Sequence, residues 1–440
     1  MGKRPFKLPR TLWGFPVDGP AIRLPPPGSE HILPGQTSDS ASTAGLGPES
    51  QVSAGQRGIA LIIAIMIISV MMLFTSDLIL TSQVNLSLAT HSKDNLKAEY
   101  MAKSGFNIAN LLLMADFAYA LFQAQQNPTN ADLASSLGDI WTVLNGIPIG
   151  GETAEMTAAF SEQFGINAIN DSSVIDSLKL FDGTFTINIS DESAKINVND
   201  CYQNGRCTQV LLMLEAMFTC PAEKAFLESK KVTGKELAYR IKDYIDPDKV
   251  ADPASGYTDE NEPYQKRTPR QMVKNAPLDS VSELRLIEGW DADVEAVFGP
   301  YITAFPYAKI RGDDKFQINI NTAARGLLQC LFPESRGDCS EKVALALRKR
   351  DEDGSTLGQP GENTAAVLRN LLCYSGGDST SHDGATRADW FKKFSTAFHI
   401  EVEGVTGDSV KKLTSVVERI IPEGKKNEKN AYRVLYWKVI

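Results

Sequence analysis

Seven acidic residues crowd a short stretch near the middle of the chain, between positions 243 and 262. They are Asp243, Asp246, Asp248, Asp252, Asp259, Glu260 and Glu262. Pro247 stands among them and cannot continue a helix, because proline has no backbone N–H and restricts the residue before it. We therefore expect a loop that brings carboxylates together. Such a cluster repels itself unless a cation neutralises it, and oxygen ligands at irregular spacing suit Ca²⁺.

The predicted calcium ligands are the carboxylates nearest this loop. Our first choices are Asp243, Asp246, Asp248 and Glu260, with Asp259 and Glu262 as further candidates. The spacing is not that of an EF-hand, since it lacks the glycine and the final glutamate of that motif. Two other interpretations remain open. One is a solvated acidic face without metal, and the other is a pair of catalytic carboxylates in a membrane-anchored, metal-dependent hydrolase.

Little else in the sequence favours an enzyme. The histidines are scattered, at His31, His91, His382 and His399, and none stands in a recognisable triad context. The sequence has no phosphate-binding loop and no dinucleotide fingerprint. The net charge of −9 also disfavours nucleic-acid binding, which needs a basic excess. We interpret the protein as structural rather than enzymatic.

A helical hairpin is predicted between residues 278 and 305. Segments 280–287 and 291–301 read as helices joined by a tight turn at Gly289, and Glu283 stands where a capping box needs it. The unit resembles a helix-hairpin-helix, but Asp291 and Asp293 beside the turn would repel phosphate. We therefore expect a packing or protein-contact role for it.

The chain has six cysteines, none in a Cys-x-x-Cys pair, and all follow the apolar segment described next. If that segment places them in the periplasm, disulfides can form. We favour the two short loops, Cys201–Cys207 and Cys330–Cys339. Free, mostly buried thiols are the alternative.

An apolar segment begins abruptly at Ile59 and carries no charged residue until Asp77. A spanning helix needs about 20 apolar residues, so residues 59–80 qualify as a single-pass anchor. A buried helix of a soluble protein is the alternative. The preceding residues, 1–58, are rich in Pro, Gly and Ser, and we expect them to be disordered. Because Gly58 follows a basic residue and precedes the apolar run, the junction resembles a prepilin-type signal. That resemblance implies peptidase cleavage between Gly58 and Ile59, then N-methylation.

The remaining elements indicate a sheet with an insertion. Residues 80–126 contain no proline and show one apolar helical face. Segment 183–189 alternates like a half-buried strand, and further strands are expected near 398–403, 412–421 and 432–440. The residues between the first strand and the later ones are helix-rich. We therefore predict an α+β protein in which a large α-helical domain interrupts an antiparallel sheet.

Seven short motifs, in this order, resemble the K-type minor pseudopilin family of bacterial type II secretion (general secretion pathway protein K). They are Arg57-Gly58-Ile59-Ala60-Leu61 with Ile63 in place of a glutamate; Ala98-Glu99-Tyr100-Met101-Ala102-Lys103-Ser104-Gly105; Asp191-Glu192-Ser193-Ala194-Lys195-Ile196-Asn197-Val198-Asn199; Asp243-Tyr244-Ile245-Asp246-Pro247-Asp248; Asn275-Ala276-Pro277-Leu278-Asp279-Ser280-Val281-Ser282-Glu283-Leu284; Ile318-Asn319-Ile320-Asn321-Thr322-Ala323; and Tyr432-Arg433-Val434-Leu435-Tyr436-Trp437. The resemblance covers about 57–440. The long leader and the stretch 340–390 depart from it.

The resemblance implies a pilin-like long N-terminal helix packed on an antiparallel sheet, with an inserted α-helical domain of helix-hairpin-helix or SAM-like type. The expected parts are a leader (1–58), the membrane half of the helix (59–80), a first pilin-like part (81–200), the insertion (201–397) and the C-terminal strands (398–440). The family also implies calcium in the insertion.

The function implied is that of a minor pseudopilin at the tip of the type II secretion pseudopilus, where it initiates assembly. Expected partners are the I- and J-type minor pseudopilins, the major pseudopilin, the inner-membrane secretion platform and the prepilin peptidase. Residues after the anchor would lie in the periplasm, with the anchor in the bacterial inner membrane. A minor pilin of a type IV pilus is the alternative within the same class.

Overall fold

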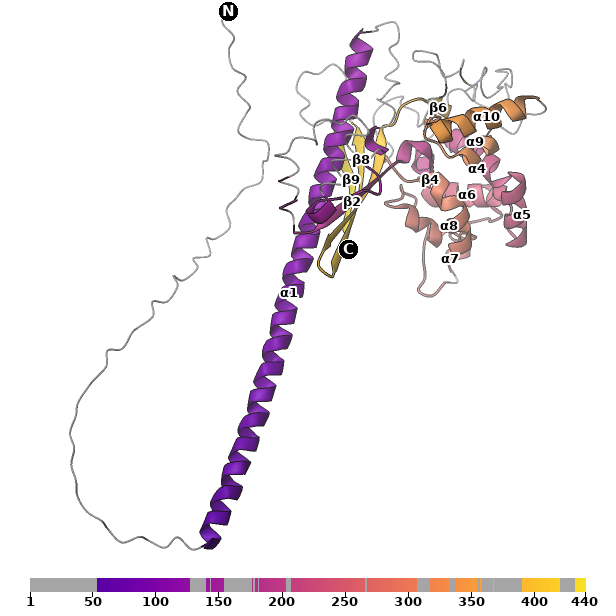
Figure 1. The fold of residues 1–440 in the computed structure, drawn as a ribbon. Helices are drawn as coiled ribbons and strands as arrows, with labels where there is room; N and C mark the ends of the chain where they lie inside the picture. The colour runs from indigo at the N-terminus through magenta and orange to yellow at the C-terminus, as the bar shows by residue number, and fades with distance from the viewer. Residues whose placement is uncertain are drawn as a thin grey trace, which may run out of the picture. The chain divides into compact units, whose positions relative to one another are not determined.

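The computed structural model describes most of the chain after residue 53 (Figure 1). The described stretches are 54–126, 140–153, 182–202, 207–306, 317–331, 338–353, 390–419 and 432–440, apart from residues 143 and 266 and with a few single residues besides. Most of the predicted leader lies outside them. The chain divides into two compact units, Met1–Asp77 and Leu78–Ile440.

The first unit contains the apolar beginning of helix α1 (Ala54–Gln126). The helix begins four residues before Gly58, so both Gly58 and Ile59 belong to it. Its large apolar side chains are exposed; Met72 and Leu73, for example, are each 71% exposed. Within the described residues, α1 provides the single segment that is long and apolar enough to cross a membrane. A side-chain surface of this kind is expected of a helix surrounded by lipid, and it fits a single-pass anchor.

The second unit contains a five-stranded antiparallel sheet in the order β1-β2-β7-β8-β9. The strands are β1 (Pro148–Ile149), β2 (Thr184–Asp191), β7 (Ala397–Thr406), β8 (Ser409–Arg419) and β9 (Tyr432–Val439). The four longer strands match the predicted ones. The short β1 was not predicted, because two residues are too few to show an alternating pattern.

Helix α1 packs on this sheet through the predicted apolar face (Figure 1). Ala102, Phe106, Ala109 and Leu113 of the helix form one core with Phe185, Ile187, Ile189, Phe398, Ile400, Val402, Leu413 and Val417 of the strands. Each fully buried Leu or Phe contributes about 1.5–3 kcal/mol relative to exposure.

Two glycines permit the close approach of helix and sheet. A Cβ on Gly404 of β7 would overlap the Ala98 carbonyl oxygen and lie 2.6 Å from the Ala102 nitrogen. A Cβ on Gly105 of α1 would lie 2.8 Å from the Phe185 ring. A side chain at position 404 would force the two backbones apart, and one at position 105 would displace the core side chains of Val402 and Phe185.

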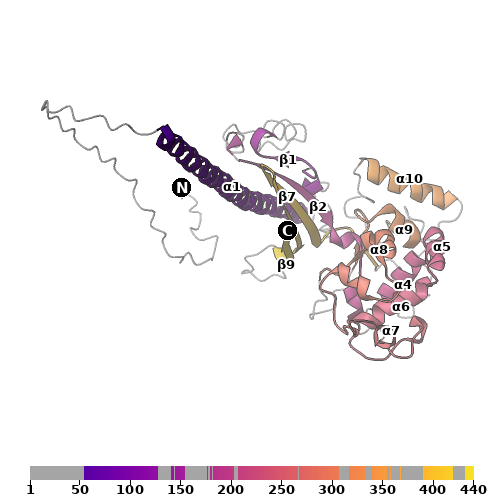
Figure 2. The same ribbon diagram turned by 90° about the horizontal axis from the view of Figure 1, so that it is seen from below.

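Between β2 and β7 the chain forms the predicted helical domain, grouped beside the sheet (Figures 1 and 2). Its α-helices are α4 (Cys207–Phe218), α5 (Pro221–Ser229), α6 (Gly234–Ile245), α7 (Glu262–Gln265), α8 (Ala292–Phe298), α9 (Arg325–Leu331) and α10 (Asp338–Asp353). Two parallel strand pairs were not predicted: β3 (Ile196–Asn197) with β4 (Ile302–Thr303), and β5 (Ile318–Asn319) with β6 (Phe391–Lys392). The stretch 340–390, which departs from the family resemblance, lies largely outside the described residues except for α10.

The expected α-helical hairpin takes a tighter form. Its first arm is the 3₁₀ helix η6 (Val281–Leu286), and its second is α8 followed by the 3₁₀ turn η7 (Gly299–Tyr301). The capping box of Ser280 and Glu283 is present. Pro300 explains part of the difference, because it supplies no N–H to continue α8.

One of the two predicted disulfides is present, and the other prediction was wrong. Cys201 bonds to Cys207, as predicted, but Cys330 bonds to Cys220 rather than to Cys339. Cys330 lies in α9, and Cys220 precedes α5. Tertiary packing thus joins residues 110 positions apart, which closeness in sequence did not indicate.

Candidate metal centre

The acidic cluster forms where α6 ends. The helix starts with a capping box of Thr233 and Glu236 and stops at Asp246, whose ψ of 156° leaves the helical region as Pro247 requires. Asp243 and Asp246 project from the last turn, and the following loop carries Asp248. The sequence expectation of a loop at Pro247 is therefore confirmed.

Three of the predicted ligands converge. One carboxylate oxygen each from Asp246, Asp248 and Glu260 lies within 4.8 Å of the others. Asp248 is exposed, whereas Asp246 is 5% and Glu260 3% exposed. Two nearly buried carboxylates and an accessible one are thus held within the span of a single ion.

Several buried oxygen atoms at this point have no protein partner. They are Asp246 Oδ1, Glu260 Oε1 and Asn275 Oδ1. A buried acceptor left unsatisfied costs roughly 1–3 kcal/mol, and a charged one costs more. Because the three atoms belong to neighbouring side chains, one cation could satisfy them together.

The raised pKa values of the clustered carboxyl groups also favour a bound cation. Burial raises the pKa of Asp243 to about 6 and, together with the nearby carboxylates, that of Glu260 to about 7. Burial also raises the pKa of Asp246, against the opposing charge of Lys242. The protein alone therefore holds these carboxylates in a state that resists ionisation, which a bound cation would reverse.

The other predicted ligands, Asp243, Asp259 and Glu262, accept hydrogen bonds from nearby residues. Asp243 accepts the backbone N–H of Asp252 and is not one of the three converging groups. Asp259 accepts the N–H of Asn261 at 2.7 Å. Glu262 accepts the hydroxyl and N–H of Thr258 at 3.2 and 3.3 Å. The structure thus uses Asp259 and Glu262 to shape the loop that presents Glu260.

Asn275 belongs to the centre although it was not among the predicted ligands. Its amide nitrogen donates to the Asp248 carbonyl oxygen and, at 3.2 Å, to Glu260 Oε2. Its φ of 46° is left-handed, a conformation that Asn tolerates better than most residues. Position 275 is distant in sequence and neutral, so a search for clustered carboxylates could not find it.

The donor set fits calcium. Carboxylate and amide oxygens are the hard ligands that Ca²⁺ prefers, and its variable geometry tolerates a loop with irregular spacing. Asp246, Asp248 and Glu260 would supply the charge, and Asn275 Oδ1 a neutral ligand.

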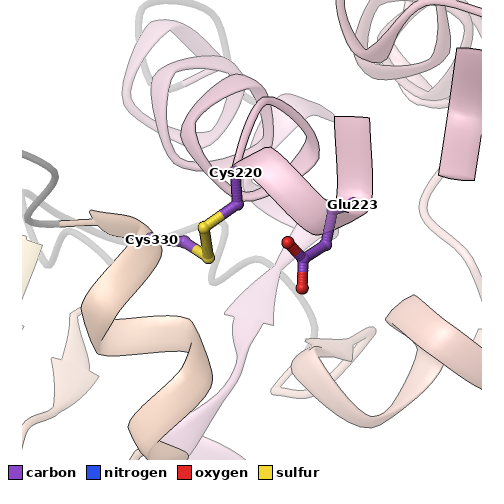
Figure 3. Close-up of side chains that lie close together, drawn as sticks. All are labelled: Cys220, Glu223 and Cys330. Atoms are coloured by element: carbon purple, nitrogen blue, oxygen red, sulfur yellow. A yellow bond between two sulfur atoms is a disulfide. The ribbon is translucent and has the colours of Figure 1, made fainter. Parts of the chain in front are cut away.

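A second group, Cys220, Glu223 and Cys330, also lies within ligand distance but differs in chemistry (Figure 3). Its two sulfur atoms are bonded to each other, and the Glu223 carboxylate lies beside them. Metal binding by cysteine requires thiolates, so this group is a disulfide and not a metal site.

Known proteins resemble this chain over most of its length. A family model described as type II secretion system (T2SS), protein K, matches residues 194–307. The type II secretion system protein K of Klebsiella pneumoniae is 27% identical over 282 residues, which are 63% of this chain and 71% of that protein. The protein of the same name from Pseudomonas aeruginosa is 22% identical over 317 residues, covering 71% and 80% respectively.

A chain in the crystal structure of the GspK-GspI-GspJ complex from enterotoxigenic Escherichia coli is also similar, with a TM-score of 0.44 and 18% identity over 66% of this chain and 96% of that one. The family match falls on the insertion, including the acidic loop and the helical hairpin. Together with the protein K relatives, it confirms the resemblance carried by the short motifs. The chain is therefore similar to type II secretion system protein K, through the family model over residues 194–307 and through three relatives of that name.

Proposed function

We propose that this protein is the minor pseudopilin that caps the tip of the type II secretion pseudopilus. In this role it associates in the inner membrane with the I- and J-type minor pseudopilins. The group then initiates addition of the major pseudopilin on the inner-membrane platform, for secretion across the outer membrane.

The observation that carries the proposal is where the insertion leaves the sheet. β2 ends at Asp191, opposite Phe398 at the start of β7. Residue Arg419, at the same end of the sheet, pairs with Asp116 near the C-terminal end of α1 at 3.1 Å. The opposite end of β7, at Gly404, lies against Ala98. The helical domain therefore emerges at the sheet end beside Asp116 of α1, and not at the end beside Ala98.

This placement suits a cap. In a pilin-like filament, a large domain at the sheet end beside Asp116 would occupy the space of the next subunit. Ile63, where pilins carry a glutamate, supports the same role. A buried carboxylate in lipid needs a partner, and a terminal subunit has no neighbour above to provide one.

Reconstitution of the complex tests the cap. We expect the full-length chain, tagged and solubilised in detergent, to co-purify with the I- and J-type pseudopilins of its own secretion system. Deleting its gene should abolish secretion of a substrate enzyme into the medium, and the wild-type gene should restore it. Normal secretion in the deletion strain, or elution of the chain without either minor pseudopilin, would contradict the proposal.

We further propose that Asp246, Asp248, Glu260 and the amide oxygen of Asn275 bind Ca²⁺. The ion supplies positive charge and links the end of α6 to the loops carrying Glu260 and Asn275. The three unpartnered buried oxygens described above support this role. Nothing in the proposal requires turnover, since these residues hold loops in place.

Thermal unfolding in calcium and in EDTA tests the metal centre. We expect calcium to raise the Tm of the full-length chain by several degrees, because an ion that binds only the folded state stabilises it. Glu260→Gln should remove most of this shift while leaving, or raising, the Tm in EDTA. Asp259→Asn, on the same loop, is the matched control and should keep the shift. An identical Tm in calcium and EDTA for the wild-type chain would rule out calcium binding.

A further inference from the structure

Lys242 lies inside the acidic cluster. Its Nζ is 3.4 Å from Asp246 Oδ2, 3.6 Å from Asp243 Oδ1 and 3.4 Å from Asp252 Oδ2. The side chain is 21% exposed, so water screens these contacts only in part. The ammonium comes from the last turn of α6, the same turn that provides two of the carboxylates.

The ammonium and the candidate metal position use different faces of Asp246. Lys242 contacts Oδ2, whereas Oδ1 is the buried atom without a partner. The unpartnered oxygen of Glu260 likewise has no ion pair with Lys242. Lys242 therefore does not fill the position of the metal, and the two positive charges can be present together at a short distance.

One ammonium cannot neutralise this cluster. The cluster contains five carboxyl groups, those of Asp243, Asp246, Asp248, Asp252 and Glu260, although burial raises the pKa of Asp243, Asp246 and Glu260. Without a metal, Lys242 is the cation among the described residues that pairs with these carboxylates and so limits their repulsion. With Ca²⁺ present, the ion's own two charges do most of this work, and the ammonium also repels the ion. The contribution of Lys242 to stability is thus larger in the metal-free state.

We propose that Lys242 is a tethered counter-ion of the metal centre: it keeps the acidic loop folded when no divalent cation is bound and lowers the affinity for that cation. This inference rests on the proposed calcium binding. It gives the centre two folded states, one held by the internal ammonium and one by the external ion.

Thermodynamic linkage connects the effect of Lys242 on the stability of the metal-free protein with its effect on the calcium affinity. If removing the ammonium destabilises the metal-free protein more than the calcium-bound protein, the calcium affinity must rise by the same free energy. A residue that served only to orient Asp246 for the metal would have the opposite effect, because its loss would weaken binding. A residue that served only for packing would change the stability of both states equally.

The test is calcium titration by calorimetry and thermal unfolding of the full-length chain in detergent. Lys242→Met keeps the length of the side chain and removes its charge. We expect calcium binding to tighten on the order of tenfold, from the Coulomb interaction of nearby charges at an intermediate dielectric. The Tm in EDTA should fall, while the Tm in saturating calcium stays close to that of the wild type. Lys249→Met removes the same charge from an exposed position of the same loop and should change neither quantity appreciably.

Lys242→Arg retains the charge and should keep the calcium affinity near the wild-type value. If Lys242→Met does not fold without calcium but purifies folded in its presence, that result also supports the proposal. Equal losses of Tm in EDTA and in calcium, or weaker calcium binding by Lys242→Met, would overturn it. A wild-type chain that does not bind calcium would instead refute the metal centre itself, so the two failures are distinguishable.

Discussion

At the scale of single residues, Glu192 holds the point where the sheet meets the inserted domain. It lies in the 3₁₀ turn η3 (Glu192–Ala194), directly after β2, and is 3% exposed. Lys195 Nζ contacts its carboxylate at 2.7 Å, and His399 Nδ1 of β7 at 3.2 Å. Although burial opposes ionisation, the His399 hydrogen bond and the Lys195 charge lower the pKa of Glu192 to about 2.

Removing this charge should have a pH-dependent effect. The pKa of Glu192 is lower in the folded than in the unfolded state, so its ionisation stabilises the fold above about pH 4.5 and this stabilisation is lost as the pH falls toward 2. Glu192→Gln should therefore reduce the free energy of unfolding by on the order of 3 kcal/mol near neutral pH and by much less near pH 2.5. Urea denaturation at the two pH values measures this. Glu403→Gln, at an exposed position of β7, the strand that carries His399, should have little effect at either pH.

The residues of the candidate metal centre illustrate what sequence can and cannot provide. Local crowding and Pro247 led to Asp246, Asp248 and Glu260, because clustering along the chain predicts a shared loop. Asn275 was missed because its role depends on how separate segments fold together, and Lys242 because the sequence was searched for clustered carboxylates. Asp259 and Glu262 have the same chemistry as the candidate ligands, and their hydrogen bonds to nearby backbone N–H groups assign them to turns.

At the scale of elements, the Cys220–Cys330 disulfide links the start of α5 to α9 across 110 residues. The other bond, Cys201–Cys207, spans 6 residues. A crosslink that closes a longer loop restricts the unfolded chain more strongly. The two bonds should therefore contribute unequally to stability.

We expect the double variant Cys220→Ala/Cys330→Ala to lose about 2–5 kcal/mol of unfolding free energy. Cys201→Ala/Cys207→Ala should lose less, because its loop is short. Guanidinium denaturation of both variants beside the wild type provides the comparison. A larger loss in the short-loop variant would show that loop entropy does not govern these bonds.

Periodicity predicted the longer elements well and the short ones poorly. Helix α1 ends at Gln126, just before Asn127 and Pro128, and the strands β2, β7, β8 and β9 follow their apolar alternation. The two-residue strands β1, β3, β4, β5 and β6 carry no readable pattern, and tertiary contacts define them. The same applies to η6, where a capping box is compatible with either a 3₁₀ or an α-helix.

At the scale of the whole molecule, the apolar beginning of α1 fits a single-pass membrane anchor. Its exposed Ile, Leu and Met side chains require lipid or another apolar environment. The sequence further predicts that the leader is removed at the Gly58 junction. Processing by the prepilin peptidase stays a prediction from the sequence.

N-terminal sequencing and intact-mass measurement of the membrane-extracted protein test this prediction. In a strain that contains the peptidase, we expect the mature chain to begin at Ile59 with a methylated amine. Gly58→Val should leave the leader in place, while Gly55→Val, three residues earlier, should be processed normally. A mature chain that starts elsewhere, or retains Met1, would exclude the pseudopilin pathway as stated.

The antiparallel pairing of β2 with β7 also constrains the order of folding. Asp191 faces Phe398, although roughly 200 residues separate them along the chain. Closing so long a loop costs entropy, and that cost falls once the intervening residues are compact. The inserted domain should therefore gain structure before the sheet is completed, and pulse-labelling hydrogen exchange should show α4 and α6 amides protected earlier than those of β2 and β7. During translation, β2 cannot pair with β7 until residues 397–406 have been synthesised. The sheet should therefore be the last part to become native.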